Sequence, residues 1–307
     1  MSASGHVGIR GDRLIHLHNT HCLYCGCLLD RSIKTKEHVI GRRFVPKGKL
    51  SASWNLIAWA CRGCNNRKAT LEDDVSAISM QPDVWGSHAR DDEALVRESR
   101  RKSLRSTSSR TGRPVVESSE TIRFSVALGP GLTATFALEA PPQIHQHRLF
   151  ELARMQLVGF FYWLTYSKEK RRGFYWVGDF FPILEARKSD WGNDTHMAFM
   201  RMVHTWEARL LTGSELIDGY YRVAIRRHPS FRLWSWALEW NHNIRIVGFF
   251  GDQDAALELA GRLPRPKVQV AGDSKAGLAL RMEAPIVSGS DVLFDWGPVA
   301  TDLQLSD

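Results

Sequence analysis

The most informative absence in this chain of 307 residues is that of cysteine beyond position 64. All five cysteines lie between positions 22 and 64, so a disulfide framework cannot link the rest of the fold. Apolar runs are also short. None reaches the roughly 18 residues that cross a membrane, and the first residues lack the apolar core of a secretory signal. We therefore expect a soluble, cytoplasmic protein without a membrane partner.

Acidic residues are outnumbered by basic ones, which bears on the choice of partner. Lys and Arg total 41 against 33 Asp and Glu, giving a formal net charge of +8 and a sequence pI near 9.4. A surplus of this sign favours polyanionic partners, of which nucleic acid is the commonest. The 43% hydrophobic content is normal for a packed core, and the length favours two domains.

Four of the five cysteines form two Cys-x-x-Cys pairs, Cys22/Cys25 and Cys61/Cys64. In a reducing compartment such pairs predict a tetrahedral zinc site, because each places two thiolates on one tight turn. Four buried thiols without a metal are the weaker alternative, since pairs at this spacing seldom recur by chance. Cys27 is interpreted as a packed thiol, with replacement of Cys25 as a zinc ligand as the minor alternative.

The 35 residues between the two pairs, 26–60, are more than a simple zinc ribbon requires. Residues 36–40 and 55–60 are strand-like runs, and the segment 65–72 is polar and compatible with a helix. The predicted order is strand, loop, strand, helix, with zinc joining the approach to the first strand to the start of the helix. A carboxylate and an imidazole, Glu37 and His38, stand next to each other in the first strand.

These residues resemble the HNH nuclease family, whose fold is a ββα unit with a metal bound between strand and helix. The family pattern combines two Cys-x-x-Cys pairs, an acidic residue before His, an Asn that opens an apolar strand, and a polar residue after the last Cys followed by Lys. In this sequence the matching residues are Cys22, Cys25, Glu37, His38, Asn55, Cys61, Cys64, Asn65 and Lys68. Asn rather than His after the last Cys is similar to the branch that includes phage junction-resolving endonucleases. The resemblance covers roughly the first quarter of the chain.

The resemblance implies a role for each polar residue of the motif. His38 would be the general base that takes a proton from water, which suits an imidazole with its near-neutral pKa. Glu37 and Asn65 would hold a catalytic Mg²⁺ or Mn²⁺ through oxygen atoms, with Asn66 as the alternative to Asn65. Asn55 would brace the loop that carries the base.

Basic residues near the motif are expected to clamp phosphates. They are Arg42, Arg43, Arg67 and Lys68. The implied activity is a metal-dependent endonuclease that hydrolyses phosphodiester bonds in DNA, in a setting such as anti-phage defence or restriction. The alternative is a non-catalytic zinc-dependent DNA-binding or regulatory protein, and a ribonuclease is a third, weaker one.

The fold class expected is α+β, with three parts along the chain. Residues 1–102 form the zinc-stapled HNH module, 103–120 a basic, Ser-rich solvated linker, and 121–307 a larger α+β domain around an antiparallel sheet. The linker arginines either contact phosphates or only keep the linker soluble: Arg105, Arg110 and Arg113. Expected elements are a helix at 91–104 capped by Asp91, a hairpin at 121–128 and 132–140, helices at 147–168 and 254–263, and strands at 220–227, 231–240 and 244–250. The last part would recognise the target or bind a small-molecule or protein activator.

Two further patterns leave alternatives open. Trp234, Trp236 and Trp240 share parity along one strand, which predicts a buried sheet face, or else an aromatic platform for stacking. The acidic run 72–74 near the end of the predicted helix is expected to be solvated surface, with a carboxylate that positions the metal's water shell as the alternative.

Overall fold

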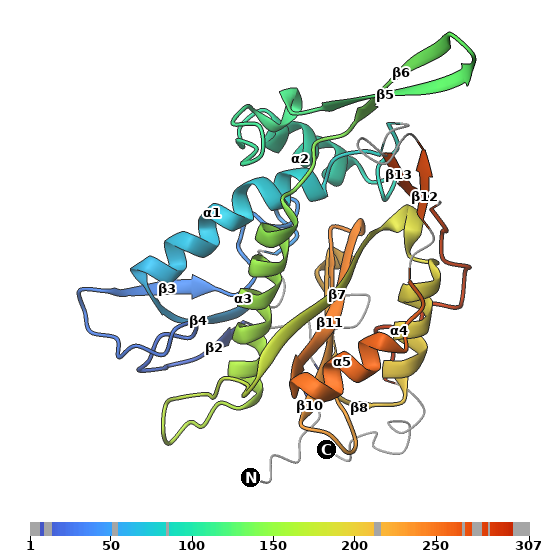
Figure 1. Cartoon of the computed structure of the whole chain (residues 1–307). Helices are drawn as coiled ribbons and strands as arrows, with labels where there is room; N and C mark the ends of the chain where they lie inside the picture. The colour runs from blue at the N-terminus through green and yellow to red at the C-terminus, as the bar shows by residue number, and fades with distance from the viewer. Residues whose placement is uncertain are drawn as a thin grey trace.

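The computed structural model describes residues 7–8, 14–50, 55–83, 86–211, 216–265, 268–271, 278–281 and 283–296. This part of the chain has a mixed α+β fold with five α-helices and mainly antiparallel sheets. A six-stranded sheet with helices on both faces forms the larger unit, and a three-stranded unit lies beside it (Figure 1). None of the helices within the described ranges is long and apolar enough to cross a membrane.

The smaller unit follows the expected strand, loop, strand, helix order. Strand β2 (Ile15–His16) lies parallel to one edge of β4 (Leu56–Cys61). Strand β3 (Lys34–His38) lies antiparallel to the other edge. Helix α1 (Arg62–Ser79) begins directly after β4, so the second cysteine pair spans the junction of strand and helix.

Helix α2 (Glu93–Ser103) packs against α1 from above in the view of Figure 1. Its N-cap is Asp92, whose carboxylate accepts the N–H of Ala94 at 2.7 Å. The expected cap, Asp91, is therefore wrong by one residue.

The segment 103–120, expected to be a solvated linker, is packed against α1 instead. Ser106 donates to the carboxylate of Asp73 at 3.0 Å. Val115, in the short turn η1 (Val115–Glu117), is fully buried. The serines of this segment thus satisfy acidic groups of α1, which is why a polar composition does not produce a solvated chain.

The larger sheet has the strand order β1-β8-β9-β10-β11-β7. Its strands are β1 (Val7–Gly8), β7 (Asp179–Arg187), β8 (Glu207–Leu211), β9 (Tyr221–Arg227), β10 (Leu233–Trp240) and β11 (Ile244–Gly251). All neighbours are antiparallel except β1 and β8. The antiparallel sheet is confirmed, including the three strands expected within 220–250, whereas β7 and β8 were not predicted.

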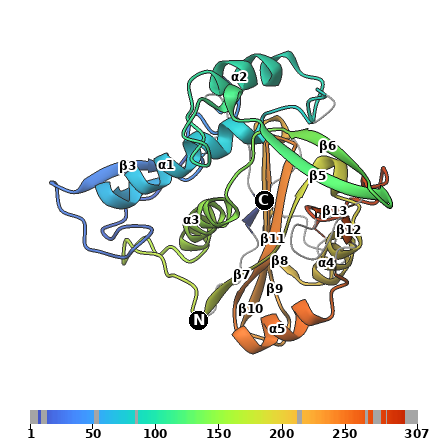
Figure 2. The same ribbon diagram turned by 45° about the horizontal axis from the view of Figure 1, so that its top comes forward.

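Helices cover both faces of this sheet. Helix α3 (Gln146–Leu164) lies between the sheet and the smaller unit, while α4 (Asp194–His204) and α5 (Gln253–Gly261) cover the other face (Figure 2). Two hairpins complete the fold. They are β5 (Glu120–Gly129) with β6 (Leu132–Ala140), which projects from the body, and β12 (Val268–Ala271) with β13 (Leu278–Arg281).

Helix α3 connects the two units because apolar side chains surround it on nearly all sides. Toward the sheet, the Gln156 carbonyl accepts the Tyr221 hydroxyl at 2.9 Å and the Trp240 indole N–H at 3.1 Å. Toward the smaller unit, Gly159 lies against Val39, directly after β3. One hydrophobic core runs from Val39 through α3 to Trp240.

The turn between β10 and β11 also reaches the smaller unit. Asn241 and His242 have φ of +52° and +58°, as a tight turn with a left-handed central pair requires. The buried Asn241 amide donates to the Ser79 hydroxyl at 2.8 Å, and Asn243 donates to the Ser79 carbonyl at 3.0 Å. The end of α1 is thereby fixed to the sheet, so the two units share a packed interface.

The three tryptophans of β10, which are Trp234, Trp236 and Trp240, face this interface. Trp236 and Trp240 are buried at 1% and 0% exposure, and Trp234 packs edge-on against Phe161 of α3. The expectation of a buried sheet face is therefore confirmed, and the aromatic platform is excluded for these residues.

The close approach of α3 to the smaller unit predicts that Gly159→Ala destabilises the protein. A Cβ at Gly159 would lie 2.8 Å from Val39, although Ala is otherwise the better helix former. We expect a loss of about 1–3 kcal/mol in the free energy of unfolding, measured by urea denaturation. The matched control is Gly261→Ala in α5, where no atom lies within 4 Å of the added Cβ. Equal stability changes in the two variants would contradict the close packing.

Candidate active site and metal centre

The four paired cysteines converge on one point at the edge of the smaller unit. Their Sγ atoms all lie within 4.8 Å of one another. The Sγ atoms of Cys25 and Cys61 are 3.8 Å apart, close to the edge of a tetrahedron with zinc–sulfur bonds of about 2.3 Å. The four thiols could therefore hold a metal ion such as zinc.

Backbone N–H groups support the same arrangement. The N–H groups of Tyr24 and Cys61 point at Cys22 Sγ, at 3.4 Å and 3.3 Å. Such donors stabilise a thiolate, the form in which cysteine binds a metal. Cys27 is half-buried and lies outside the four-sulfur group, although its carbonyl accepts the N–H of Cys22 at 2.7 Å.

A second site lies between β3 and α1, at a cavity of about 660 Å³. His38 and Glu37 from β3 and Asn65 from the first turns of α1 all line it. Arg42 and Arg43, from the loop after β3, line it as well. The structure thus brings together the three residues expected to do the chemistry and two of the four expected to contact phosphates.

Glu37 is buried, and its contacts leave one oxygen for the cavity. Its Oε1 atom accepts the Tyr24 hydroxyl at 2.9 Å and pairs with the Lys68 ammonium, also at 2.9 Å. Burial raises the pKa of Glu37, an effect that the charge of Lys68 partly offsets. Among the described residues, Oε2 has no such partner.

Lys68 is itself buried, at 1% exposure. Its Nζ atom lies 2.6 Å from Glu72 and donates to the His38 carbonyl at 3.0 Å. Burial lowers the pKa of Lys68, but the carboxylates of Glu72 and Glu37 outweigh this effect and place the pKa above its ordinary value. The expected phosphate contact by Lys68 is therefore wrong, because the ammonium is enclosed by protein. The expectation that the run 72–74 is solvated surface is wrong for Glu72, an ion-pair partner at the cavity. It is also wrong for Asp74, which is 2% exposed and pairs with Arg148, whereas Asp73 is exposed.

Among the described residues, the side-chain amide of Asn65 is bonded through its nitrogen, which leaves its carbonyl oxygen available. Its Nδ2 atom donates to Thr35 Oγ1 at 3.0 Å and to the Lys36 carbonyl at 3.3 Å. Oxygen is the donor that a hard cation requires, so Asn65 and Glu37 are the candidate ligands for an ion of that class. Asn66 is exposed and does not line the cavity, which favours Asn65 over Asn66 as the candidate ligand.

His38 is half-buried beside several cations. Burial, followed by the charges of Arg42, Lys36 and Lys68, lowers the pKa of His38 to about 4. The imidazole is consequently neutral at physiological pH and able to accept a proton.

Asn55, at 1% exposure, braces the loop that follows His38. Its Oδ1 atom accepts the N–H of Ile40 at 3.4 Å, and its Nδ2 atom donates to the Ile40 carbonyl at 2.8 Å. This pair of bonds fixes the chain two residues after His38, which is the orienting geometry expected of Asn55.

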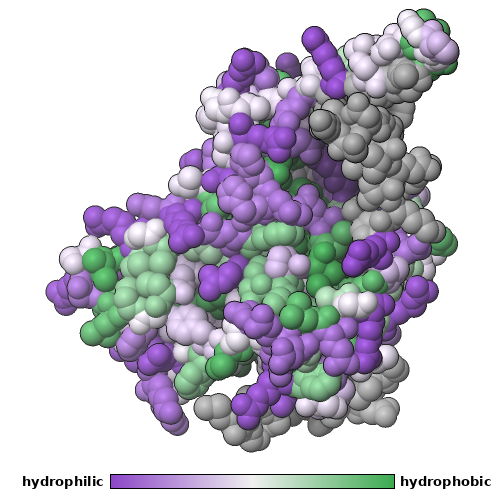
Figure 3. Space-filling view, in the orientation of Figure 1, coloured by the Kyte–Doolittle hydropathy of each residue, from purple (hydrophilic) through white to green (hydrophobic). Residues whose placement is uncertain are grey.

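A second cavity of about 910 Å³ continues from the first and shares six lining residues with it: Lys36, His38, Arg42, Arg43, Asp73 and Lys102. Its opposite wall comes from the end of α2 and the residues that follow. Most of the side chains in this wall are basic: Arg101, Lys102 and Arg105. The surface over α1 and α2 is mostly hydrophilic (Figure 3). The two cavities form a groove lined by cations from two separate segments, and we name it the basic groove.

The contribution of α2 was missed by the sequence analysis. A run of basic residues at positions 100–102 was visible, but only the packing of α2 on α1 places it opposite His38. Arg67, expected to contact phosphates, instead pairs with Glu151 of α3 and lines neither cavity of the basic groove.

Comparisons with models of known protein families, with curated proteins and with solved structures find no match to this chain.

The metal centre predicts different outcomes for cysteines inside and outside the four-sulfur group. Cys61→Ser removes a ligand that joins β4 to α1, so we expect zinc below one equivalent and unfolding of the smaller unit, because structural zinc contributes about 10–16 kcal/mol to folding in small zinc domains. Cys27→Ser is the matched control and should keep one equivalent. Zinc is measured by atomic emission and folding by circular dichroism. A zinc-free Cys61→Ser protein with unchanged unfolding would contradict the structural role.

Proposed function

We propose that this protein is a metal-dependent endonuclease of the HNH type that hydrolyses phosphodiester bonds in DNA. The observation that carries the proposal is that a neutral imidazole, a carboxylate and an amide line one cavity within the basic groove. A binding module would need the cations but not these three groups together. The proximity of the four-cysteine group supports the same assignment.

His38 would act as general base. A neutral imidazole takes a proton from a water molecule as its oxygen attacks phosphorus. The pKa of about 4 makes the free imidazole a weak base. Negative phosphates in the groove would offset the charges of Arg42 and Lys36, which would raise this pKa toward neutrality.

Glu37 and Asn65 would hold a divalent cation such as Mg²⁺ or Mn²⁺ through their oxygens. When bound, this ion would supply Lewis acidity that stabilises charge on the phosphate and on the leaving oxygen. The chain's own part is to fix both oxygens. Lys68 holds Glu37, and Thr35 holds the Asn65 amide.

The basic groove suits a polyanion because cations stand on both sides of His38. Arg42 and Arg43 form one side, and Arg101 and Arg105 form the other. A backbone phosphate between them would meet several cations at once, which gives affinity that does not depend on sequence. DNA rather than RNA is inferred from the family resemblance, as is a role in anti-phage defence or restriction.

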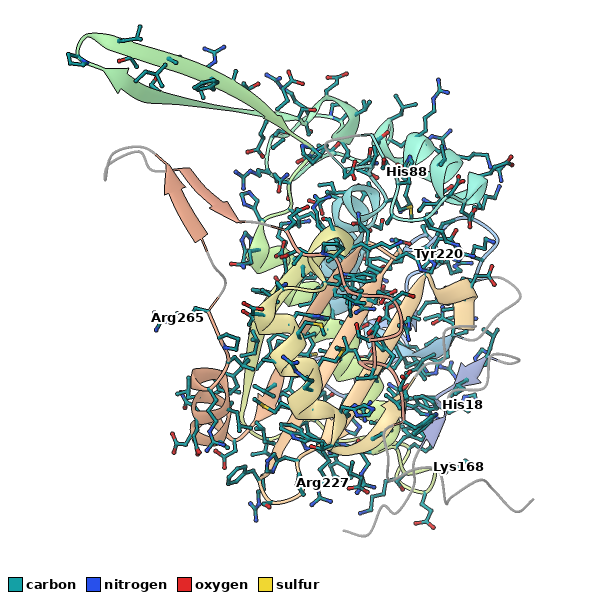
Figure 4. The ribbon with its side chains drawn as sticks, turned by 90° about the vertical axis from the view of Figure 1, so that its right-hand side faces the viewer. His18, His88, Lys168, Tyr220, Arg227 and Arg265 are labelled. Atoms are coloured by element: carbon teal, nitrogen blue, oxygen red, sulfur yellow. The ribbon has the colours of Figure 1, made fainter. Side chains whose placement is uncertain are left out.

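The catalytic role of His38 predicts loss of cleavage in His38→Ala. We expect plasmid nicking in Mg²⁺ or Mn²⁺ to fall about a hundredfold or more, because a general base contributes that much to the rate. His18→Ala is the matched control. Its side chain is exposed, lines neither cavity, and lies near the 165–172 loop, where Arg171 donates to the His18 carbonyl (Figure 4).

The assay separates catalysis from binding if DNA affinity and zinc content are measured on the same samples. Equal zinc and affinity in both variants, with cleavage lost only in His38→Ala, would support the proposal. Tight binding of plasmid, single-stranded and branched DNA without cleavage of any of them by the wild type would favour the non-catalytic DNA-binding protein. Cleavage of RNA alone would favour the ribonuclease.

The opposite wall of the groove predicts a selective loss of affinity. Arg105→Ala should weaken DNA binding and lower the slope of log affinity against log salt by about one, since one phosphate contact is lost. The turnover number at saturating DNA should not change. Arg97→Ala, on the preceding helix α2, is the control, because Arg97 is exposed and lines neither cavity. Identical salt slopes for Arg105→Ala, Arg97→Ala and wild type would remove Arg105 from the binding surface.

A further inference from the structure

A row of buried charges lies on the far face of the large sheet, beneath α4. Arg222 of β9, Glu239 of β10 and Arg245 of β11 are direct neighbours across three strands. Arg245 and Glu239 are only 1% and 2% exposed. Glu239 lies 2.8 Å from Arg245 and 3.6 Å from Arg222, so a single carboxylate of the sheet serves two guanidinium groups.

The second carboxylate comes from a distant segment, residues 283–296, which we name the strap. Asp291 of the strap pairs with Arg245. The ring of Phe294 lies 4.1 Å from the Arg222 guanidinium and 5.5 Å from that of Arg245. The strap is held at its other end by the Ala284 carbonyl, which accepts the N–H of Gly192 at 2.6 Å.

The charge balance of this face depends on the strap. With the strap in place, two guanidinium groups face two carboxylates. Without Asp291, one positive charge would lack a counter-charge in a buried site, which is strongly unfavourable. The Asp291 side chain is 25% exposed, so solvent reaches the point at which its carboxylate meets Arg245. Another anion could therefore approach by the same route.

Several donors at this site are not used by the chain. Within the described ranges, Nη1 of Arg245 and Nε of Arg222 are buried without a hydrogen-bond partner. The two ring nitrogens of His196 are likewise buried without one, and one of them carries a proton when the ring is neutral. His196 lies on the buried side of α4, at 1% exposure, and the charge of Arg245 adds to burial in lowering its pKa to about 4. Buried donors without partners are rare in folded proteins. A carboxylate offers two oxygens, whereas a phosphate group offers more acceptors for such a set.

Flat side chains border the same guanidinium groups. The ring of Trp191 lies 3.6 Å from the Arg245 guanidinium, and Phe294 packs near both arginines. Helix α4, which carries His196, lies over the sheet on this side (Figure 4). Arginines next to aromatic rings suit a ligand that combines a phosphate group with a planar ring.

We propose that Arg222, Arg245 and His196 form a binding site for a small phosphate-bearing ligand, and that Asp291 and Phe294 of the strap occupy its place when the ligand is absent. The ligand class is a phosphate monoester or diphosphate. The Trp191 ring beside Arg245, and the Phe294 ring that holds the ligand's place, favour a nucleotide over the free anion. The site lies on the face of the sheet opposite α3 and is independent of the proposed nuclease chemistry.

The test uses the full-length protein, in Mg²⁺-free buffer, titrated with inorganic phosphate, pyrophosphate and AMP by calorimetry. Asp291→Asn removes the strap's charge, so we expect at least one probe to bind about tenfold more tightly than it binds the wild type, because the competing group is weakened. Asp295→Asn is the matched control. It makes the same change in charge four residues away, where the carboxylate is exposed and Arg226 contacts only the backbone carbonyl. This control should leave the affinity unchanged.

Arg222→Gln in the Asp291→Asn background should abolish the gain, with folding checked by thermal unfolding. If that variant does not fold, His196→Ala in the same background replaces it, and the same loss is expected. If AMP binds more tightly than inorganic phosphate, the ligand is a nucleotide whose ring contacts the aromatic side chains. If inorganic phosphate binds more tightly, the ligand is the free anion. The proposal is overturned if Asp291→Asn binds none of the three probes, if Asp295→Asn gives the same gain, or if the gain survives loss of Arg222 or His196.

Discussion

One buried ammonium group fixes the geometry on which the candidate site depends. Lys68 of α1 contacts Glu37 at 2.9 Å and Glu72 at 2.6 Å, and it donates to the His38 carbonyl at 3.0 Å. A buried charge that lost one of these partners would be destabilising by several kcal/mol, so the three groups hold α1 and β3 in one relative position. Glu72 extends the constraint by accepting the N–H of Gly41 at 3.0 Å, which fixes the loop that carries Arg42 and Arg43.

The same unit is secured from two further directions. The four-cysteine group joins the turn before β3 to the start of α1, which fixes the end of the helix that carries Asn65. Helix α3 closes the other side, where Gly159 permits contact with Val39, the residue after His38. His38 therefore belongs to a rigid strand supported by the core of the whole molecule, as a site that must position a reacting group requires. The basic groove adds charge from α2, a segment that the packing of α1 brings into place.

Sequence patterns correctly predicted the features of the fold that depend on neighbouring residues in the chain. The two cysteine pairs, the order of β3, β4 and α1, and the alternation along β10 were readable because each depends on residues close in sequence. Lys68 was misread as a phosphate ligand because its partner Glu37 lies 31 positions earlier and only folding buries the pair. The segment 103–120 was wrongly predicted to be a solvated linker for the same reason, because Ser106 donates a hydrogen bond to Asp73, which lies 33 positions earlier. The sequence patterns did not single out Arg222 and Arg245, although their positions opposite Glu239 follow from strand register.

The most direct test of the candidate site is a crystal structure with Mn²⁺, recorded with anomalous data at the zinc and manganese edges. The proposed site predicts zinc bonded to all four thiolates at about 2.3 Å. It also predicts manganese about 2.1–2.2 Å from oxygens of Glu37 and Asn65, with the His38 ring facing the ion across a gap wide enough for a phosphate group. Manganese bound directly by His38, or no manganese between β3 and α1 at saturating concentration, would contradict it.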